Sequence, residues 1–337
     1  MKSAEQPTVF ITRAIPEEAM APAAGKVRFI VGPDDRPATR AELLDGFRRA
    51  DAVVSMLNDP IDGALLAAAG PRVRVVANYA VGFNNIDVQA AAQLGIWAAN
   101  TPEATTDSTA DLAMSLMLAL GRHLNEGQAE LRAGRFGGWS PKEHLGLLLR
   151  GARLGIIGMG RIGQAVAERA RAFGMSIAYF TRTPLTAERE AQLGAVRLEL
   201  NELLTVSDVV TLHCPLTPQT RHLLDAAALA RMKRGAILVN TSRGPVVDEA
   251  ALAAALLSGH LGGAALDVYE NEPKVHPDLL RAPNALLVPH LGTSTLRTRV
   301  IMGEKAFANV LEVLEGREPP YPVNRPSSPR GPCGAAG

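Results

Sequence analysis

The sequence has few cysteines, few aromatic residues and no long hydrophobic run. Its two cysteines, Cys214 and Cys333, cannot form a disulfide framework and match no zinc motif, so we expect no metal site and a reduced, cytoplasmic setting. Aromatic residues make up 4% of the chain, which argues against a surface that stacks bases. The longest strongly apolar stretches, such as 112–120, are far shorter than the roughly 18 residues of a membrane span, so we expect no membrane partner. The polar start, 1–7, leads directly into a strand-like run, which predicts no signal peptide.

The two signs of charge nearly balance along the 337 residues. Lys and Arg total 35 against 34 Asp and Glu, which gives a formal net charge of +1. Because nucleic-acid-binding proteins usually concentrate basic residues on one face, we expect no nucleic-acid partner. A hydrophobic share of 47% and a charged share of 20% are typical of folded proteins, and the length suggests two domains.

Apolar strand-like runs alternate with helical segments through the middle of the chain. The predicted strands there are 153–158, 176–181, 208–213, 236–240, 263–268 and 285–289. The first hundred residues repeat the rhythm, with predicted strands at 8–12, 27–31, 52–56, 73–78 and 95–99. Continuous apolar strands that alternate with helices predict parallel sheets covered on both faces, so the fold class is α/β with two doubly wound domains. Two long helical segments, 107–121 and 294–315, flank the middle unit, and we expect a flexible tail at 324–337.

A glycine-rich turn follows the first middle strand and opens a helix. Gly158, Gly160 and Gly163, with Arg161 and Ile162 between them, form a GxGxxG pattern. Such glycines allow a tight turn, close approach of a pyrophosphate and close helix–strand packing, while the helix N-terminus attracts phosphate. The pattern predicts a dinucleotide site, and the alternative is an ordinary turn.

The end of the next strand lacks the acid that usually holds an NAD ribose. No Asp or Glu occupies 175–187, and Thr181, Arg182 and Thr183 stand where the acid is expected. A carboxylate would repel a 2′-phosphate, whereas an arginine with two hydroxyls would bind it. This predicts NADPH as the preferred cofactor; the alternative is a solvated arginine with NAD tolerated.

Three later strands end in residues suited to reducing a 2-oxo acid. Arg243 can form a forked contact with a carboxylate, and His290 can deliver a proton near neutral pH. Glu272 can accept from the other imidazole nitrogen and orient the ring. Each residue alone has a structural alternative: Arg243 a surface ion pair, and His290 a structural histidine.

With these motifs in view, the sequence resembles the D-isomer-specific 2-hydroxyacid dehydrogenases, in their glyoxylate/hydroxypyruvate reductase branch. The resemblance runs through NYAVGFNNID, NTPEATTDSTADLA, FGGWSP, LGIIGMGRIGQAVA, LHCPLTPQT, ILVNTSRGPVVDE, ALDVYENEP and VPHLGT. It implies a cofactor domain, 102–289, inserted into a substrate domain of 1–101 and 290–323, and a homodimer. It also implies that Arg243, Glu272 and His290 are catalytic.

Further site residues follow from the resemblance alone. At the cofactor it implies Thr106, Cys214, Pro215, Thr241, Ser242, Asp267 and Gly292. At the substrate it implies the backbone of Val81 and Gly82, together with Arg243 and His290, and it implies that Trp139 helps to shape the pocket across the dimer.

The sequence therefore predicts an NADPH-preferring reductase of glyoxylate and hydroxypyruvate. In it the nicotinamide supplies the hydride and His290 the proton. A 2-ketogluconate-type or other D-2-hydroxyacid dehydrogenase that uses NAD stays open, as does a dinucleotide-sensing, corepressor-like binding protein. A phosphorylated substrate is disfavoured, because 75–87 contains no Lys or Arg to hold a second anionic group.

Overall fold

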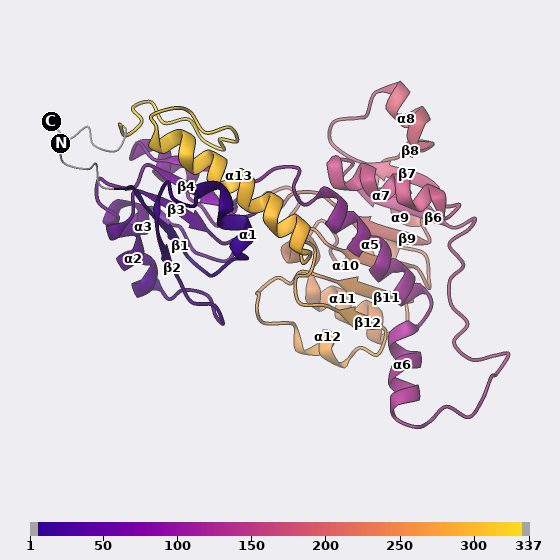
Figure 1. The fold of residues 1–337 in the computed structure, drawn as a ribbon. Coiled ribbons are helices and arrows are strands. Elements are labelled where there is room, and N and C mark those ends of the chain that lie inside the picture. The colour runs from indigo at the N-terminus through magenta and orange to yellow at the C-terminus, as the bar shows by residue number, and fades with distance from the viewer. Residues whose placement is uncertain (1–5, 332–337) are drawn as a thin grey trace, which may run out of the picture. The chain divides into compact units, whose positions relative to one another are not determined.

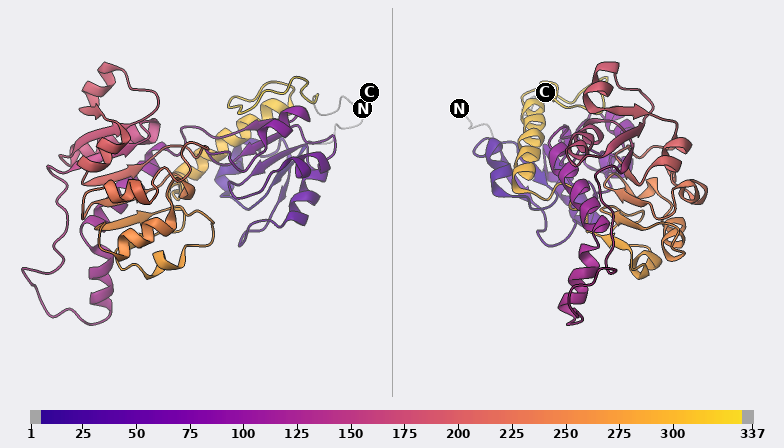
Figure 2. Two further views of the ribbon diagram at one scale, coloured as in Figure 1. Left: turned by 180° about the vertical axis from the view of Figure 1, so that it is seen from behind. Right: turned by 90° about the vertical axis from the view of Figure 1, so that its right-hand side faces the viewer.

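The computed structural model describes residues 6–331, and the chain divides into two compact units. The first consists of Met1–Thr105 with Ser294–Gly337, and the second of Thr106–Thr293 (Figures 1 and 2). The predicted boundaries, 101/102 and 289/290, lie slightly before these. His290 is consequently part of the second unit rather than of the domain to which the sequence assigned it. Within 6–331, no helix combines the length and the hydrophobicity that crossing a membrane requires.

The first unit is built on a five-stranded parallel sheet. Its strand order is β2-β1-β3-β4-β5. The strands are β1 (Thr8–Ile11), β2 (Arg28–Val31), β3 (Ala52–Ser55), β4 (Val75–Asn78) and β5 (Trp97–Ala99). The helices are α1 (Glu17–Met20), α2 (Arg40–Arg49), α3 (Gly63–Ala68), α4 (Val88–Gln93) and α13 (Leu296–Leu314).

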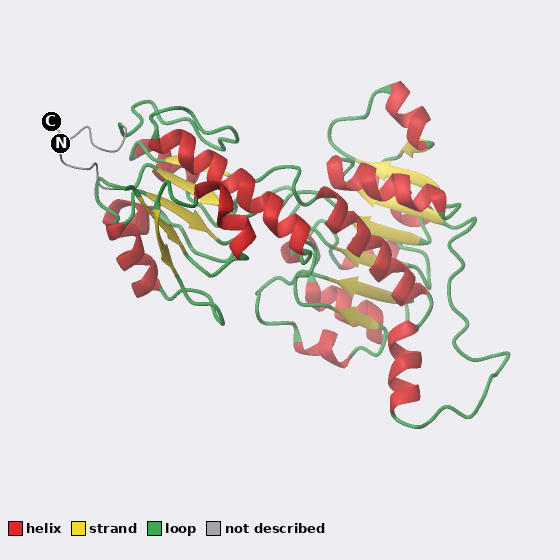
Figure 3. Ribbon diagram, in the orientation of Figure 1, coloured by secondary structure: helices red, strands yellow, loops and turns green. Residues whose placement is uncertain are grey.

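Side chains of this sheet alternate between two cores, one on each face. Val9 and Ile11 lie in a buried cluster with Phe307 of α13, whereas the intervening Phe10 lies in another cluster with Phe47 of α2. Because successive residues of a strand point to opposite faces, a strand that is apolar throughout needs helices on both sides. Figure 3 shows this arrangement of helices around the sheet.

The second unit is built on a seven-stranded parallel sheet of order β12-β11-β10-β9-β6-β7-β8. Its strands are β6 (Arg153–Ile157), β7 (Ser176–Phe180), β8 (Ala195–Arg197), β9 (Val209–Leu212), β10 (Ile237–Asn240), β11 (Gly263–Leu266) and β12 (Ala285–Leu287). Its helices are α5 (Thr106–Gly121), α6 (Leu124–Arg132), α7 (Arg161–Ala172), α8 (Ala187–Leu193), α9 (Leu200–Val206), α10 (Ala226–Arg231), α11 (Glu249–Leu257) and α12 (Pro277–Arg281). The six predicted strands are present, and the short edge strand β8 was not predicted. The α/β class with two parallel-sheet domains is confirmed.

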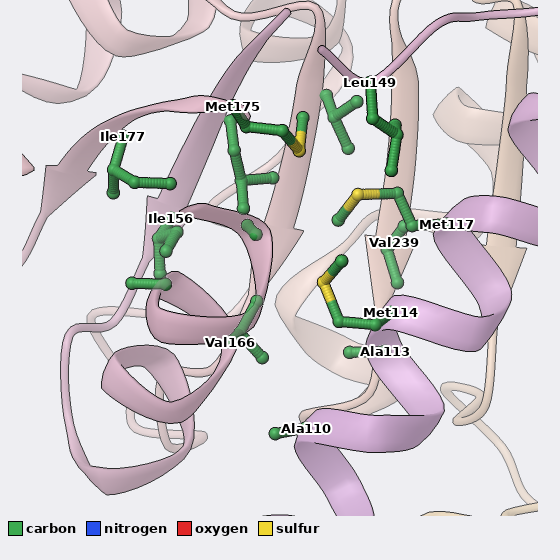
Figure 4. Close-up of a cluster of buried hydrophobic side chains, with 14 of the residues drawn as sticks. Ala110, Ala113, Met114, Met117, Leu149, Ile156, Val166, Met175, Ile177 and Val239 are labelled. Carbon is green, nitrogen blue, oxygen red and sulfur yellow. The ribbon is translucent and has the colours of Figure 1, made fainter. Parts of the chain in front are cut away.

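One core of the second unit lies where α5 and α7 cover one face of the sheet. Met114 and Met117 of α5 belong to one buried cluster with Val166 of α7 and Val239 of β10 (Figure 4). Met114 and Met117 are three residues apart, as one face of a helix requires. This core supports the strands whose carboxyl ends carry the candidate site.

The prediction of a flexible tail from 324 is wrong for the residues that the structure describes. Val323 N–H donates to Ala98 O of β5 at 2.8 Å, and Asn324 Oδ1 accepts from Ala98 N–H at 2.8 Å. Arg330 donates to the carbonyls of Leu94, Gly70 and Val73 at 2.9, 2.7 and 2.7 Å. Proline, glycine and serine do not make a segment loose when its side chains satisfy otherwise orphaned backbone carbonyls. Positions 332–337 lie outside the described residues.

Replacement of Arg330 tests whether this segment contributes to stability. Arg330→Ala removes three charge-assisted hydrogen bonds, so the free energy of unfolding should fall by about 1.5–3 kcal/mol. Scanning calorimetry should show a midpoint lower by about 2–4 °C for each kcal/mol. Arg325→Ala is the control, because Arg325 is exposed and its ion pair, with Glu318 at 3.3 Å, lies at the surface. Equal midpoints for the two variants would contradict the structural role of Arg330.

Candidate active site

The predicted cofactor and catalytic residues of the second unit gather at one edge of its sheet. All its strands run parallel, so their carboxyl ends lie together. In α/β sheets this edge is where ligands bind. The segments that follow the strands there begin at Gly158, Thr181, His213, Thr241, Asp267 and Val288.

The glycine-rich turn has the geometry of a dinucleotide cradle. A Cβ on Gly158 would lie 2.5 Å from Cys214 N, and one on Gly163 would lie 2.2 Å from Gly158 O, so both sites are packed against backbone. A Cβ on Gly160 would meet no atom within 4 Å. The helix α7 begins after Gly160, which provides no side-chain cap, and a helix N-terminus of this kind attracts an anion. The turn therefore fits a bound pyrophosphate, with Arg161 and Ile162 in the first turn of the helix.

The segment after β7 carries an exposed cationic side chain, that of Arg182. Thr181 is half-buried, and Arg182 and Thr183 are exposed. Within 6–331, no hydrogen bond or ion pair engages the Arg182 side chain. The guanidinium is thus open to an anionic ligand.

The turn after β10 is organised by Asn240, which the sequence did not single out. Asn240 Oδ1 accepts from Ser242 N–H and Oγ–H at 3.0 and 2.8 Å, and its amide donates to Arg243 O at 3.1 Å. The hydroxyl of Thr241 is buried and has no hydrogen-bond partner in the described chain. An orphaned hydroxyl at a strand end suits a ligand with polar groups, as a dinucleotide is. The signal that could have found Asn240 is its place at the strand end, since asparagine commonly bonds nearby backbone.

The backbone of the turn after β10 passes very close to the segment that follows β11, and this close approach places Arg243 beside that segment. A Cβ on Gly244 would lie 1.8 Å from the carbonyl carbon of Tyr269, so only glycine fits there. Burial lowers the pKa of Arg243, and the charge of Glu272 partly offsets this effect. The Arg243 guanidinium donates to Ser242 O at 2.7 Å. Most of its other donors remain for a planar anion such as a carboxylate.

Glu272 and His290 form a hydrogen-bonded pair. His290 Nδ1 lies 3.0 Å from Glu272 Oε2 and 3.2 Å from Oε1, and Glu272 Oε1 also accepts from Tyr269 N–H at 3.0 Å. Burial acts to raise the pKa of Glu272, but the hydrogen bond and charge of His290, the Tyr269 N–H and the charge of Arg243 together hold it below its ordinary value. Glu272 is therefore ionised at neutral pH. Since Nδ1 faces the carboxylate, Nε2 is the nitrogen left for a reacting group.

Asp267 fixes the loop that carries His290. Its two carboxylate oxygens accept from Leu291 N–H at 2.5 Å and Gly292 N–H at 2.9 Å. Thr109 Oγ1 of α5 donates to Gly292 O at 3.3 Å, so the loop is held from two sides. Burial raises the pKa of Asp267, although both backbone N–H groups act to lower it. The resemblance places Asp267 and Gly292 at the cofactor, and the bond between them gives both a part in shaping the loop that carries His290.

Cys214 has no sign of reactive chemistry. It is buried at the end of β9, and burial raises the pKa of its thiol to about 11. The thiol is therefore protonated at neutral pH, which suits a packing role beside the glycine turn. Pro215 follows it on the surface.

Two predicted substrate residues lie in the first unit, and a third lies on an exposed loop of the second. Val81 and Gly82 follow β4, and neither backbone N–H donates a hydrogen bond to a residue that the structure describes. Trp139 lies between α6 and β6 with 86% of its surface exposed, so its own chain does not bury it in a pocket. Phe136, Leu145 and Leu148 on the same loop are exposed as well. Such a set of exposed apolar side chains is typical of an interaction surface.

A glycine cradle, a Glu–His pair and a half-buried arginine at the carboxyl edge of a parallel sheet define the class of dinucleotide-dependent dehydrogenases. The family model described as "D-isomer specific 2-hydroxyacid dehydrogenase, NAD binding domain" matches residues 114–292. A curated glyoxylate reductase of Thermococcus kodakarensis is 44% identical over 324 residues, which cover 95% of this chain and 97% of the relative. The chain therefore belongs to the D-isomer-specific 2-hydroxyacid dehydrogenases and is an NAD(P)-dependent enzyme of that family.

Solved structures agree with this assignment. A protein of Thermus thermophilus superposes with a TM-score of 0.88 at 44% identity, covering 94% of this chain and 99% of that one. An NADPH-dependent glyoxylate/hydroxypyruvate reductase of Sinorhizobium meliloti, in complex with NADP and malonate, gives a TM-score of 0.81 at 31% identity, covering 98% of this chain and 100% of that one.

Two glycine variants separate cofactor binding from folding. Gly160→Ala adds a methyl group to open space, so the unfolding midpoint should stay at the wild-type value. The same methyl group would occupy the space of a pyrophosphate, and the dissociation constant of the dinucleotide should rise about tenfold or more. Gly163→Ala is the contrasting variant, because its methyl group clashes with Gly158 O and should lower the midpoint. Wild-type dinucleotide affinity in Gly160→Ala, measured by fluorescence titration, would exclude the cradle.

Proposed function

We propose that the enzyme reduces glyoxylate and hydroxypyruvate to the corresponding 2-hydroxy acids, with NADPH as the preferred cofactor. The observation that carries the proposal is the Glu272–His290 pair, which leaves one imidazole nitrogen available, with the half-buried Arg243 near enough to Glu272 to lower its pKa. The similarity to the Thermococcus glyoxylate reductase supports glyoxylate as a substrate. The similarity to the NADPH-dependent Sinorhizobium reductase supports hydroxypyruvate and NADPH.

Three side chains have different roles in the proposed reaction. Arg243 holds the substrate carboxylate and polarises the adjacent carbonyl through the planar fork of its guanidinium. His290 donates the proton on Nε2 to the carbonyl oxygen, which becomes the hydroxyl group of the product. Glu272 keeps the ring in the orientation for this transfer by accepting a hydrogen bond from Nδ1. When bound, the nicotinamide supplies the hydride.

The cofactor site is proposed from the cradle and its neighbours. Gly158, Gly160 and Gly163 would admit the pyrophosphate, and the orphaned hydroxyl of Thr241 would face a polar group of the dinucleotide. Thr106, Cys214 and Pro215 are assigned to this site by resemblance alone. Arg182, with Thr181 and Thr183, would hold the 2′-phosphate of NADPH.

A second copy of the chain is the proposed partner of the exposed loop. Trp139 and its apolar neighbours expose a large apolar area to water, which is unfavourable. Burial of these side chains in a homodimer would remove this area from water and stabilise the dimer. In such a dimer Trp139 would belong to the partner's substrate pocket, as the resemblance implies.

The assay that tests the function measures NADPH and NADH oxidation with a panel of 2-oxo acids. The proposal expects the highest kcat/KM for glyoxylate or hydroxypyruvate. A maximum for 2-ketogluconate would favour the sugar-acid alternative, and dinucleotide binding without turnover would favour a sensing protein.

Arg243→Lys distinguishes a substrate clamp from a structural cation. The variant keeps the positive charge but loses the planar fork, so KM for glyoxylate should rise and kcat should fall together. We expect kcat/KM to fall by about ten- to a hundredfold, since hydrogen bonds to charged groups contribute about 1.5–3 kcal/mol. Arg234→Lys, on the exposed turn before β10, serves as the control. Near-normal kinetics of Arg243→Lys would mean that the guanidinium does not hold the carboxylate.

The residues after β7 predict the preference between the two cofactors. An Arg182–phosphate contact contributes about 1.5–3 kcal/mol, which corresponds to roughly tenfold to a hundredfold in kcat/KM in favour of NADPH. Since Arg182 is exposed, the preference should fall as salt is added. Thr181→Asp combined with Arg182→Ala should reverse it. Equal kcat/KM values for the two cofactors in the wild type, or a preference for NADH, would refute this assignment.

A further inference from the structure

The loop that carries Val81 and Gly82 is held by its carbonyl groups. Ala80 O accepts from Thr101 N–H at 3.0 Å, and Val81 O accepts from the side-chain amide of Asn100 at 2.7 Å. Gly82 O accepts from the side-chain amide of Asn78 at 2.7 Å. Three successive peptide carbonyls are thus satisfied within the first unit.

These bonds determine where the N–H groups point. In a trans peptide the C=O and N–H bonds of one unit point in opposite directions. The Ala80 carbonyl shares its peptide with the Val81 N–H, and the Val81 carbonyl shares its peptide with the Gly82 N–H. Because Thr101 and Asn100 hold these two carbonyls, both N–H groups are directed away from the segment after β5. Neither group finds an acceptor among the described residues.

Asn100 and Asn78 are themselves fixed by the surrounding structure. Asn309, fully buried in α13, donates from its amide to Asn100 O at 2.9 Å, and Asn309 Oδ1 accepts from Tyr321 N–H at 2.9 Å. Ser55 Oγ–H donates to Asn78 Oδ1 at 2.9 Å, and the Asn78 amide also donates to Asn85 Oδ1 at 3.1 Å. The backbone of Asn100 is therefore held by α13, and the orientation of the Asn78 amide is specified by a donor to its oxygen and acceptors for its nitrogen.

We infer that Asn100 is a positioning residue of the substrate site, which orients the Val81–Gly82 peptide so that the Gly82 N–H receives the substrate carboxylate beside the Val81 N–H, whose peptide Thr101 holds. Asn78 holds the following peptide, between Gly82 and Phe83, and so fixes the other end of the loop. The inference rests on the proposed function, which supplies the carboxylate. An asparagine amide suits this task because it donates strongly to a carbonyl and carries no charge. A lysine or arginine at the same place would compete with the loop for the anion.

The test replaces Asn100 and compares substrate affinity with turnover. In Asn100→Ala the Val81 peptide loses its anchor, so KM for glyoxylate and the inhibition constant of oxamate, a non-reducible 2-oxo acid analogue, should both rise about three- to tenfold. Both kcat and KM for NADPH should stay close to the wild-type values. Asn324→Ala is the matched control, since Asn324 also bonds backbone carbonyls of the first unit, at Val88 O and Ile96 O rather than at Val81 or Gly82.

Asn100→Asp provides a second readout that a general structural defect would not give. An ionised aspartate cannot donate to Val81 O, whereas a protonated one can. The ratio of oxamate inhibition constants between this variant and the wild type should therefore decrease as the pH is lowered toward the aspartate pKa. The Asn100→Asp variant also keeps the inference testable if Asn100→Ala does not fold.

The outcomes separate the inference from the function on which it rests. If the wild type neither reduces glyoxylate nor binds oxamate, the proposed function fails. If it does both and Asn100→Ala keeps wild-type KM and inhibition constants, or matches Asn324→Ala, the positioning role is refuted. A pH-independent ratio for Asn100→Asp would refute it as well.

Discussion

The geometry of the candidate site depends on one buried carboxylate, that of Asp267. It accepts the N–H groups of Leu291 and Gly292 and so joins the end of β11 to the loop after β12. His290, immediately before these donors, adopts a left-handed backbone with φ of 55°, a conformation that costs free energy for a residue other than glycine. The two hydrogen bonds offset this cost and set the ring where Nδ1 meets Glu272.

Both units use the same physical device at the carboxyl ends of their strands. In the second unit Asn240 and Asp267 bond backbone groups of the turns that present Thr241, Arg243 and His290. In the first unit Asn78 and Asn100 bond the carbonyls beside Val81 and Gly82. Short polar side chains that saturate one side of a turn leave the other side for a ligand, and this gives loop residues the rigidity that catalysis requires.

The sequence predicted the sheets well, because fully buried parallel strands are continuous apolar runs that composition alone reveals. Its prediction of a Glu272–His290 contact agrees with the hydrogen bond between the two side chains, while the catalytic roles of Arg243, Glu272 and His290 stay a prediction. It missed Asn240 and the bridging hydroxyl of Tyr269, which donates to Val288 O at 2.9 Å, since hydrogen bonds to backbone leave no periodic signal. The tail was predicted to be flexible from its proline, glycine and serine content. The bonds that hold it join Arg330 to carbonyls far away in the sequence, at Gly70 and Val73, and local composition does not reveal such bonds.

The most direct test of this account is the single-turnover rate of NADPH oxidation by His290→Ala at saturating glyoxylate. Loss of the proton donor should lower the rate by about 100-fold or more while the NADPH dissociation constant is unchanged. His222→Ala is the matched control, because His222 forms another histidine–glutamate pair of the second unit, with Glu270, and should retain the wild-type rate. A His290→Ala rate within a few-fold of the wild type would contradict the assignment of His290 as the proton donor.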